Sequence, residues 1–276
     1  MTVDYTVLDP TGNITLLVTT PVPVPEQPLT AKKLMELEPA AEQVGFVSDP
    51  AGSSIRLRMA GGEFCGNAAM SAAALCTVLK KEKHSLPSPD KDNSITVYVS
   101  GTEEPVHVAA MAIPGFPGEE AAWKGTVTMP GPVTVGEELL PFGPENILLP
   151  VVRIPGITHI IVNDGSVKIG KSDAEFLARR WCSCLQAEAL GVLFLDIGNG
   201  TMEPFVYVPA ADTVFWESSC ASGTTAAGAY LAAAQGKPVS LSLNQPGGTL
   251  SISVQQDGRM LLSGSVRMVS RGTVIF

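Results

Sequence analysis

The hydrophobic and polar positions of the chain follow the same order twice. Each half offers an apolar strand broken by a turn, then a helix, a second apolar strand and an alternating strand. These elements are expected at 7–18, 31–41, 44–47 and 56–59 in the first half, and at 151–162, 173–190, 192–197 and 203–208 in the second. Thr30 and Ser172 are residue types that cap helix N-termini, and each directly precedes its expected helix.

A second helix is expected in each half, at 68–79 and at 223–234. Both segments are apolar nearly all round, which is typical of a helix that is enclosed rather than mounted on a surface. Further strands follow, at 95–99 and 106–110, and at 239–243 and 250–254. The repeat interval is far longer than that of a solenoid. The pattern therefore predicts a mixed α/β protein of two pseudo-symmetric domains, each a curved sheet around a central helix.

The expected domain boundary lies in a stretch rich in Pro, Gly and Glu near residues 114–123. We therefore expect an N-terminal domain at 1–118 and a C-terminal domain at 119–269, with 270–276 returning to the first. Aligning Gly12 with Gly156 places Thr15 opposite His159 in the duplication.

Composition excludes several function classes. The net charge is −9 and no basic patch is evident, which argues against nucleic acid as a partner. No apolar run is long enough to span a bilayer, and the first ten residues do not resemble a secretory signal. Five cysteines without a framework spacing indicate free thiols in a reducing cytoplasm. The oligomeric state is left open, with a homodimer among the alternatives.

Two segments carry the candidate chemistry. Gly62-Glu63-Phe64-Cys65-Gly66-Asn67 and Ser218-Ser219-Cys220-Ala221-Ser222-Gly223 each place a cysteine just before an enclosed helix. Free N–H groups and the positive end of a helix lower the pKa of a thiol, so this position favours a thiolate. One cysteine per half predicts two thiols that act on opposite faces of one substrate carbon, one removing a proton and the other supplying one.

No cofactor is expected. The sequence carries no convincing pyridoxal phosphate signature, dinucleotide fingerprint or P-loop, and Cys182-Ser183-Cys184 lacks the partner pair that a zinc site needs. Without an electron sink, the carboxylate of an amino-acid substrate would be held by N–H groups at the two helix N-termini.

These residues resemble the diaminopimelate epimerase-like family of pyridoxal-independent amino-acid racemases. The resemblance covers nearly the whole chain and rests on Cys65-Gly66-Asn67, on Cys220 with Ser222-Gly223-Thr224, and on the duplicated layout. Within the family the chain is most similar to the histidine racemase branch, which supplies D-histidine for opine-type metallophores. The family fold implies two α/β domains with the active site in the cleft between them.

The resemblance also implies roles for particular residues. Cys65 and Cys220 would be the base and the acid, with His159 and Glu217 orienting substrate or tuning the thiols. The substrate would be contacted by the side chains of Asn13, Gln43 and Asn67, and by the backbone N–H groups of Gly66, Ala221, Ser222 and Gly223. Purely structural roles are the alternatives: His159 as a buried strand histidine, Glu217 as a helix N-terminal charge and Asn13 as a turn residue.

One departure from the family argues against diaminopimelate as substrate. The epimerases carry an Arg near the second cysteine that pairs the distal carboxylate, whereas residues 212–220 contain no Arg or Lys. Ala221 is a second departure, since the family usually has Gly there. Ala221 does not indicate which substrate is used. The missing cation, taken with the resemblance to the histidine racemase branch, favours histidine. Diaminopimelate epimerase, a proline racemase-like enzyme, an isomerase of unsaturated tricarboxylates and a non-catalytic amino-acid-binding relative remain the alternatives.

Overall fold

The computed structural model describes residues 1–276 except 53, 83–93, 115–120, 132, 164–168 and 210–211. The chain divides into two compact units, Met1–Thr128 with Ser263–Phe276, and Met129–Leu262. Both are mixed α/β, as the sequence predicts.

The first unit is a sheet that closes on itself. Its strands follow one another in the order β1-β2-β3-β4-β5-β6-β7-β16, and β16 pairs again with β1. Their bounds are β1 Thr2–Pro10, β2 Thr15–Val18, β3 Gln43–Ser48, β4 Ser54–Met59, β5 Ser94–Val99, β6 Val106–Ile113, β7 Ala122–Thr128 and β16 Met260–Ile275. β16 enters this unit at Ser263. The closure leaves one enclosed face, on which a helix can be buried.

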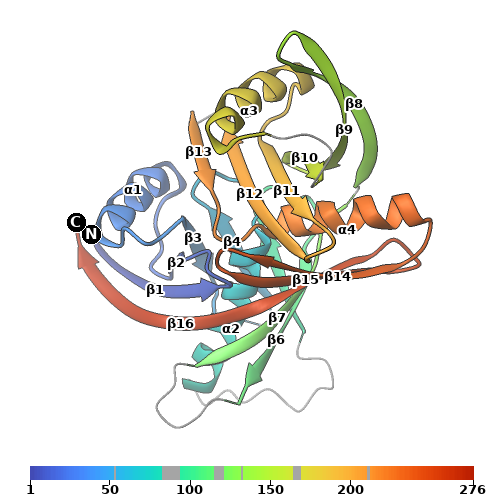
Figure 1. Ribbon diagram of the computed structural model, residues 1–276. Helices are drawn as coiled ribbons and strands as arrows, with labels where there is room; N and C mark the ends of the chain where they lie inside the picture. The colour runs from blue at the N-terminus through green and yellow to red at the C-terminus, as the bar shows by residue number, and fades with distance from the viewer. Residues whose placement is uncertain (53, 83–93, 115–120, 132, 164–168, 210–211) are drawn as a thin grey trace. The chain divides into compact units, whose positions relative to one another are not determined.

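That helix is α2, Gly66–Glu82, which packs on β1, β2 and β4 to β7 (Figure 1). Its small residues allow a close approach to the strands and are buried nearly all round, as the sequence predicts. The short η1 (Val24–Glu26) leads into α1 (Gln27–Leu37), whose Ala31 and Leu34 pack with Leu16, Val44 and Phe46 in a separate core cluster.

The second unit also packs one enclosed helix on a continuous path of strands. Its strand path runs β8-β9-β10-β11-β12-β14-β15-β16, with β13 pairing on β12. The bounds are β8 Thr134–Phe142, β9 Glu145–Ile154, β10 Ile157–Asn163, β11 Leu190–Asp196, β12 Thr201–Val208, β13 Thr213–Trp216, β14 Val239–Gln245 and β15 Gly248–Val254. The helix α4, Ala221–Gln235, packs on β8 to β11, β14 and β15. A Cβ at Gly228 of α4 would lie 2.7 Å from Ile252, so only glycine allows this close approach.

The helix α3, Lys171–Leu185, is the counterpart of α1. Its Trp181 is fully buried among Leu177, Val192 and Phe205, and the indole Nε1 donates to the carbonyl oxygen of Pro141 at 2.8 Å. The duplication is therefore confirmed at the level of topology. In each unit two parallel strands flank a helix (β2-α1-β3 and β10-α3-β11), an antiparallel strand follows, and a cysteine then precedes the enclosed helix.

Both predicted helix caps were wrong. α1 begins at Gln27, so Thr30 lies inside the helix, where its hydroxyl donates to the carbonyl oxygen of Glu26 at 3.0 Å. α3 begins at Lys171 with Gly170 as its N-cap, two residues before Ser172. It ends at Leu185, because Gln186 adopts a left-handed conformation with φ of 51°.

The division between the units follows strand pairing. β7 pairs with β6, which keeps residues up to Thr128 in the first unit. The boundary expected at 118–119 falls outside the described residues. The returning segment is longer than the expected 270–276, since Val266 and Met268 already pair with β1.

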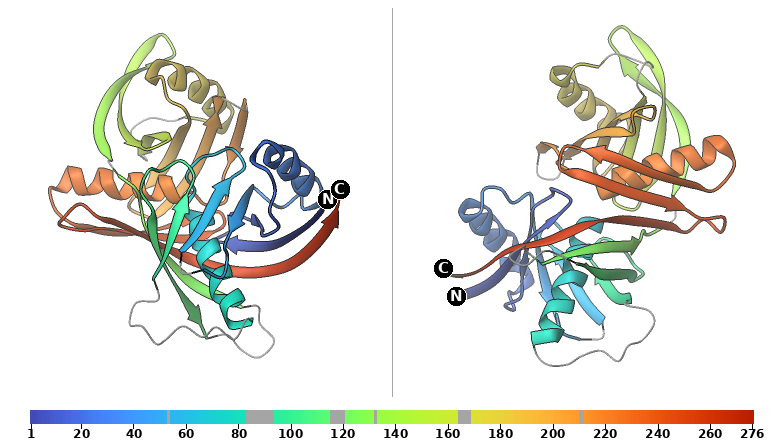
Figure 2. Two further views of the ribbon diagram at one scale, coloured as in Figure 1. Left: turned by 180° about the vertical axis from the view of Figure 1, so that it is seen from behind. Right: turned by 60° about the horizontal axis from the view of Figure 1, so that its bottom comes forward.

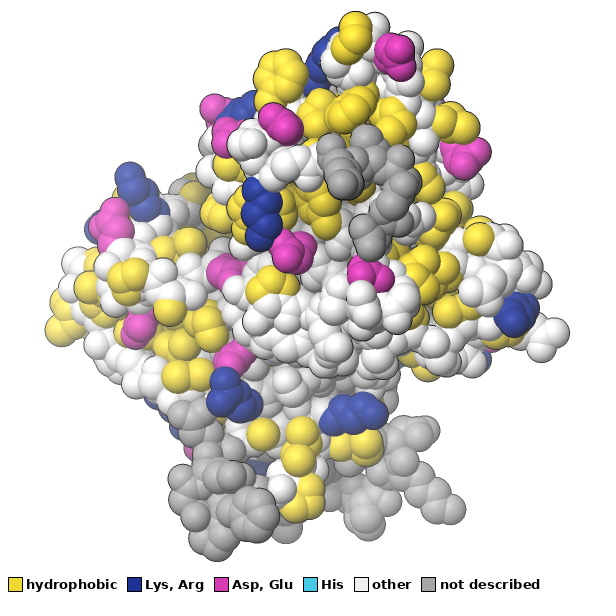
Figure 3. Space-filling model, viewed as in Figure 1, with side chains coloured by type: hydrophobic (Ala, Val, Ile, Leu, Met, Phe, Trp, Pro, Cys, Tyr) yellow, Lys and Arg dark blue, Asp and Glu magenta, His cyan; other side chains and the backbone are white. Residues whose placement is uncertain are grey.

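The two chain ends lie side by side in Figures 1 and 2. The amino group of Met1 donates to the carbonyl oxygen of Phe276 at 2.6 Å, and the N–H of Phe276 donates back to Met1. Lys and Arg side chains are scattered over the face shown in Figure 3 rather than gathered in a patch. No helix in the described part of the chain is long and apolar enough to cross a membrane.

Candidate active site

Cys65 lies at the start of α2, where the sequence places it. The carbonyl oxygen of Cys65 accepts from the N–H of Ala69 at 3.0 Å, the first hydrogen bond of the helix. The N–H of Ala68 donates to Cys65 Sγ at 3.4 Å. The thiol is partly exposed, whereas Gly66 and Asn67, the next residues of the helix, are buried. A substrate anion can therefore meet the N–H groups of the first helical turn at this point.

Two further candidate residues join Cys65 in one hydrogen-bonded chain. The thiol donates to Gln43 Oε1 at 3.1 Å. The other end of the same carboxamide, Gln43 Nε2, donates to Asn13 Oδ1 at 2.5 Å. Asn13 Nδ2 in turn donates to Glu42 Oε2 at 2.8 Å. The first unit therefore brings Asn13, Gln43 and Cys65 together, although they lie far apart in the sequence.

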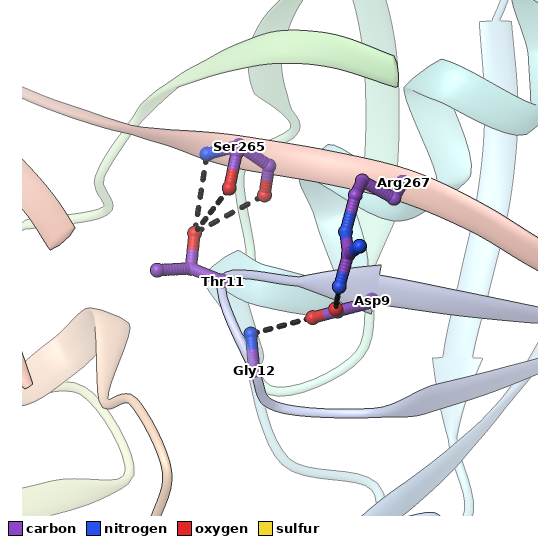
Figure 4. A network of polar contacts seen from close by, with 5 residues as sticks. All are labelled: Asp9, Thr11, Gly12, Ser265 and Arg267. Carbon is purple, nitrogen blue, oxygen red and sulfur yellow. Dashed lines mark hydrogen bonds and ion pairs between the residues drawn. The ribbon is translucent and has the colours of Figure 1, made fainter. Parts of the chain in front are cut away.

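A turn with unusual backbone geometry carries Asn13. Thr11 has φ of 57°, a left-handed conformation that is rare for a β-branched residue. Its hydroxyl makes three contacts with Ser265 of β16: it accepts from the N–H at 3.1 Å, donates to the carbonyl oxygen at 3.1 Å and lies 3.4 Å from Oγ (Figure 4). Asp9 accepts from the N–H of Gly12 and pairs with Arg267. Asn13 is thus a turn residue and also part of the cysteine network.

Cys220 is the N-cap of α4 in the second unit. Its Sγ accepts from the N–H of Gly223 at 3.3 Å, and its carbonyl oxygen accepts from the N–H of Thr224 at 3.0 Å. A Cβ at Gly223 would lie 2.8 Å from Leu193 and 3.2 Å from Cys220 Sγ. Glycine therefore allows the sulfur to reach the first turn of the helix.

The sequence predicted a lowered thiol pKa, and for Cys220 the net direction is the opposite. Burial raises the pKa of this thiol well above its usual value, and Glu217 raises it further, as a negative charge and as a hydrogen-bond acceptor. Ser222 and the N–H of Gly223 act in the opposite direction but do not outweigh them. Glu217 is therefore more than a helix N-terminal charge, because it acts on the candidate thiol itself.

His159 lies on β10 and is fully buried. Its Nε2 is 3.0 Å from Ser222 Oγ, which lies 3.4 Å from Cys220 Sγ. Burial lowers the pKa of His159 to about 3, so the imidazole is neutral near pH 7. The structure therefore connects His159 to the second cysteine through a serine hydroxyl.

Two residues that contact Cys220 or His159 were not among the predicted site residues. Gln245, at the end of β14, accepts from the N–H of Cys220 at 2.8 Å and donates to the hydroxyl of Thr224 at 2.9 Å. Gly191, on β11, pairs with His159, and a Cβ there would lie 2.1 Å from His159 Nδ1. A Gln just after the strand expected at 239–243 was the available signal for Gln245. Gly191 could be found only from the pairing of β10 with β11.

Ala221 is buried at the first position of α4, and its carbonyl oxygen accepts from the hydroxyl of Thr225 at 2.9 Å. In the described part of the chain, no group of three or more His, Cys, Asp and Glu side chains is arranged to hold a metal ion. All five cysteines are described and are free thiols.

Comparison with known proteins decides the family. The model of the histidine racemase CntK N-terminal domain matches residues 2–275. The chain belongs to this family. It is an isomerase, an amino-acid racemase, and its substrate is a small molecule.

Two relatives illustrate the match. A histidine racemase of Fusobacterium nucleatum subsp. nucleatum is 32% identical over 278 residues, which cover 98% of this chain and 96% of the relative. A histidine racemase of Staphylococcus aureus is 24% identical over 284 residues, with the same coverage. The family resemblance proposed from the cysteine motifs is therefore confirmed.

Solved structures share the fold of the racemase at low sequence identity. A hydroxyproline epimerase from Agrobacterium vitis has a TM-score of 0.66 at 13% identity, covering 99% of this chain and 92% of that one. A PhzF-family phenazine biosynthesis protein from Bacillus anthracis has a TM-score of 0.65 at 14% identity and covers both chains fully. The predicted fold class is confirmed by these neighbours.

Proposed function

We propose that this racemase interconverts L- and D-histidine without a cofactor, with Cys65 and Cys220 as the two acid–base groups. The observation that carries the proposal is the duplication of one arrangement: each unit places a single cysteine at the N-terminus of its enclosed helix, with a backbone N–H donating to the sulfur. Histidine is the substrate named for the relatives in both organisms.

In the proposed reaction one sulfur is a thiolate and the other a thiol. The thiolate takes the Cα proton, so the Cα–H bond breaks and its electron pair stays on the substrate as a carbanion conjugated with the carboxylate. The opposite thiol then gives its proton to the other face of Cα. Thiol and thiolate have exchanged roles at the end, and proton exchange with water restores the starting state.

The negative charge that develops on the substrate carboxylate needs donors that are already in place. The N–H groups of Gly66 and Asn67 in the first unit and of Ala221, Ser222 and Gly223 in the second are our candidates, because they lie in the first turns of α2 and α4. Donors fixed by a helix need no reorganisation when the charge develops. Exclusion of water around the buried Cys220 strengthens these interactions.

Because the pKa of Cys220 is raised, another group must stabilise its thiolate before Cys220 can act as the base. We propose that the α-ammonium group of the bound amino acid does so, since a positive charge near a thiol favours the ionised form. Ser222 supports the same state, because its hydroxyl lies within reach of the sulfur. A reducing cytoplasm would keep both thiols available for this chemistry.

The substrate proposal is tested with a panel of L-amino acids and diaminopimelate, followed by chiral chromatography. We expect racemisation of histidine in both directions and little turnover of diaminopimelate, since residues 212–220 offer no cation for its distal carboxylate. Faster turnover of diaminopimelate than of histidine would overturn the substrate. Activity should survive dialysis against a chelator, and recovery only after adding zinc or pyridoxal phosphate would overturn cofactor independence.

The mechanism is tested with Cys65→Ser and Cys220→Ser. A hydroxyl is too weak an acid to supply its conjugate base near neutral pH, so each variant should lose racemisation while keeping its fold. The matched control is Cys184→Ser, because Cys184 is exposed on α3 and should not take part. A single active-site variant that racemises at the parent rate would overturn the two-thiol mechanism.

A further inference from the structure

The carboxamide of Gln43 has one end at Cys65 and the other at Asn13 and Thr15. Cys65 Sγ is 3.1 Å from Oε1, while Nε2 donates to Asn13 Oδ1 and, at 2.8 Å, to Thr15 Oγ1. Which end faces the sulfur matters chemically. A carbonyl oxygen can only accept, so it favours the S–H form of the thiol, whereas an NH₂ group would favour the thiolate.

Thr15 fixes the orientation of this carboxamide. Its hydroxyl has a single proton, which it donates to the backbone carbonyl oxygen of Asn13 at 3.0 Å. That oxygen can only accept, so toward Gln43 the hydroxyl must accept as well. The NH₂ end of Gln43 is therefore the end that faces Thr15, and the oxygen is left for Cys65. Thr15 is fully buried, so water does not compete for this hydroxyl.

Asn13 fixes the same orientation by a separate route. Glu42 Oε2, a carboxylate oxygen, accepts from Asn13 Nδ2 at 2.8 Å. The NH₂ end of Asn13 is thereby directed to the carboxylate, and its oxygen is turned toward Gln43. This oxygen again requires the NH₂ end of Gln43. The backbone carbonyl oxygen of Asn13 and the carboxylate of Glu42 can only accept. Both place the NH₂ end of Gln43 away from Cys65.

The backbone holds these side chains in register. Thr15 and Gln43 are paired residues on the parallel strands β2 and β3. Asn13 follows the strained turn at Thr11, which Ser265 of β16 holds through its backbone N–H and carbonyl oxygen (Figure 4). The orientation of Gln43 is therefore set by the sheet and by the turn rather than by a mobile loop.

We propose that Thr15 and Asn13 are positioning residues that lock the Gln43 carboxamide so that Cys65 keeps its proton in the substrate-free enzyme. The role of Cys65 in turnover rests on the proposed function. When the Cα–H of the bound enantiomer faces Cys220, Cys65 is the acid that supplies the new proton. The N–H of Ala68 donates to Sγ and so favours the thiolate, but at 3.4 Å this hydrogen bond is weak.

The described segments next to this network carry charged side chains. Glu42 precedes β3, Glu63 lies in the loop before Cys65, and the Arg58 guanidinium of β4 lies 3.5 Å from where a Cβ of Gly62 would be. All three remain in every variant of the test, so their effects on Cys65 cancel in the comparison.

The test is the pH dependence of Cys65 alkylation by iodoacetamide, without substrate, read at each cysteine by mass spectrometry. Thr15→Val combined with Asn13→Leu removes both groups that accept from Gln43 Nε2, at nearly constant shape. We expect the profile of this double variant to move to lower pH, with the Cys65 rate at pH 7 rising by about threefold to tenfold. Thr15→Ser keeps both acceptors and should follow the parent. A double-variant profile that coincides with the parent, or moves to higher pH, overturns the proposal.

Thr15→Ala combined with Asn13→Ala gives a second reading in case the larger replacements do not fold. This pair also removes both acceptors and adds no charge, so the profile should move to lower pH, and an unchanged or higher profile overturns the proposal. Alkylation needs no turnover. If these variants show the shift but the parent enzyme fails to racemise histidine, the result counts against the proposed function and leaves the orientation of Gln43 standing.

Discussion

Gly191 and His159 face each other on the paired strands β10 and β11, so closely that a Cβ at Gly191 would lie 2.1 Å from His159 Nδ1. The first unit has the same strand pairing between Thr15 and Gln43. In the first unit the smaller residue, Thr15, is on the earlier strand β2. In the second unit the smaller residue, Gly191, is on the later strand β11. Each pair places one long polar side chain near a cysteine network.

Gly191→Ala should therefore displace the imidazole. A methyl group in that place forces His159 away from Ser222, and we expect kcat to fall by about tenfold to a hundredfold, since small misplacements near a reacting group have effects of this size. Overpacking should also lower the free energy of unfolding by about 1–3 kcal/mol. Steady-state kinetics and urea unfolding measure the two effects.

Gly136→Ala is the matched control, because a Cβ at this strand position meets nothing within 4 Å. It should keep both activity and stability. Parent-like kinetics in Gly191→Ala would show that the position of His159 does not matter for turnover.

The buried His159 makes stability depend on pH. Its pKa is about 3 in the folded chain against an ordinary value of 6.5. Between these values the unfolded chain binds a proton at this residue and the folded chain does not, so lowering the pH favours unfolding. Above pH 6.5 His159 does not lower the free energy of unfolding. At pH 5 its protonation in the unfolded chain should have lowered the free energy of unfolding by about 2 kcal/mol.

His159→Gln should lose that part of the pH dependence. The measurement is urea unfolding at pH 7 and pH 5, with His107→Gln on the exposed side of β6 as the control. The free energy of unfolding should fall less between the two pH values in His159→Gln than in the parent or the control. An equal fall in all three proteins would contradict the assignment.

Glu217 should set the reactivity of Cys220. Burial is the larger cause of the raised thiol pKa, and Glu217 adds to it through its charge and its hydrogen bond. Glu217→Gln removes the charge, so Cys220 should be alkylated at lower pH than in the parent. Cysteine-resolved alkylation across a pH series measures this. Cys65 provides an internal control, and a Cys220 profile that stays in place or moves to higher pH would refute the role of Glu217.

The turn that carries Asn13 should depend on the hydroxyl of Thr11. Thr11→Val leaves the backbone N–H and carbonyl oxygen of Ser265 without this partner, whereas Thr11→Ser keeps the hydroxyl. We expect Thr11→Val to lower the free energy of unfolding by about 1 kcal/mol, because it removes hydrogen bonds that are only partly shielded from water. Urea unfolding of both variants tests this, and equal stability would count against it.

The sequence predicted those parts of the molecule that local pattern determines. The enclosed helices α2 and α4 follow from runs of small apolar residues, and the cysteines stand at their N-termini as expected. Helix ends were less predictable, because the left-handed Gln186 that ends α3 carries no distinct signal. The direction of the pKa shift of Cys220 could not be predicted either, because burial and the approach of Glu217 depend on the folded chain.

The hydrogen-bond partners of the site could not be predicted either. Gln245 reaches Cys220 from a strand end 25 residues along the chain, and Thr15 reaches Gln43 only through the parallel pairing of β2 with β3. Such contacts depend on strand register, which hydrophobic periodicity does not specify for a strand buried on both faces.

The most direct test of the two-thiol account is deuterium incorporation at Cα during racemisation of L-histidine in D₂O. Product formed at early conversion should carry deuterium, because the acid thiol has exchanged with solvent. The remaining L-histidine should stay protiated, because a separate thiol removed its proton. Mass spectrometry after chiral separation measures both pools. Deuterium that enters the remaining L-histidine as fast as the D-histidine, or D-histidine that retains the original proton, would contradict a mechanism with one thiol on each face.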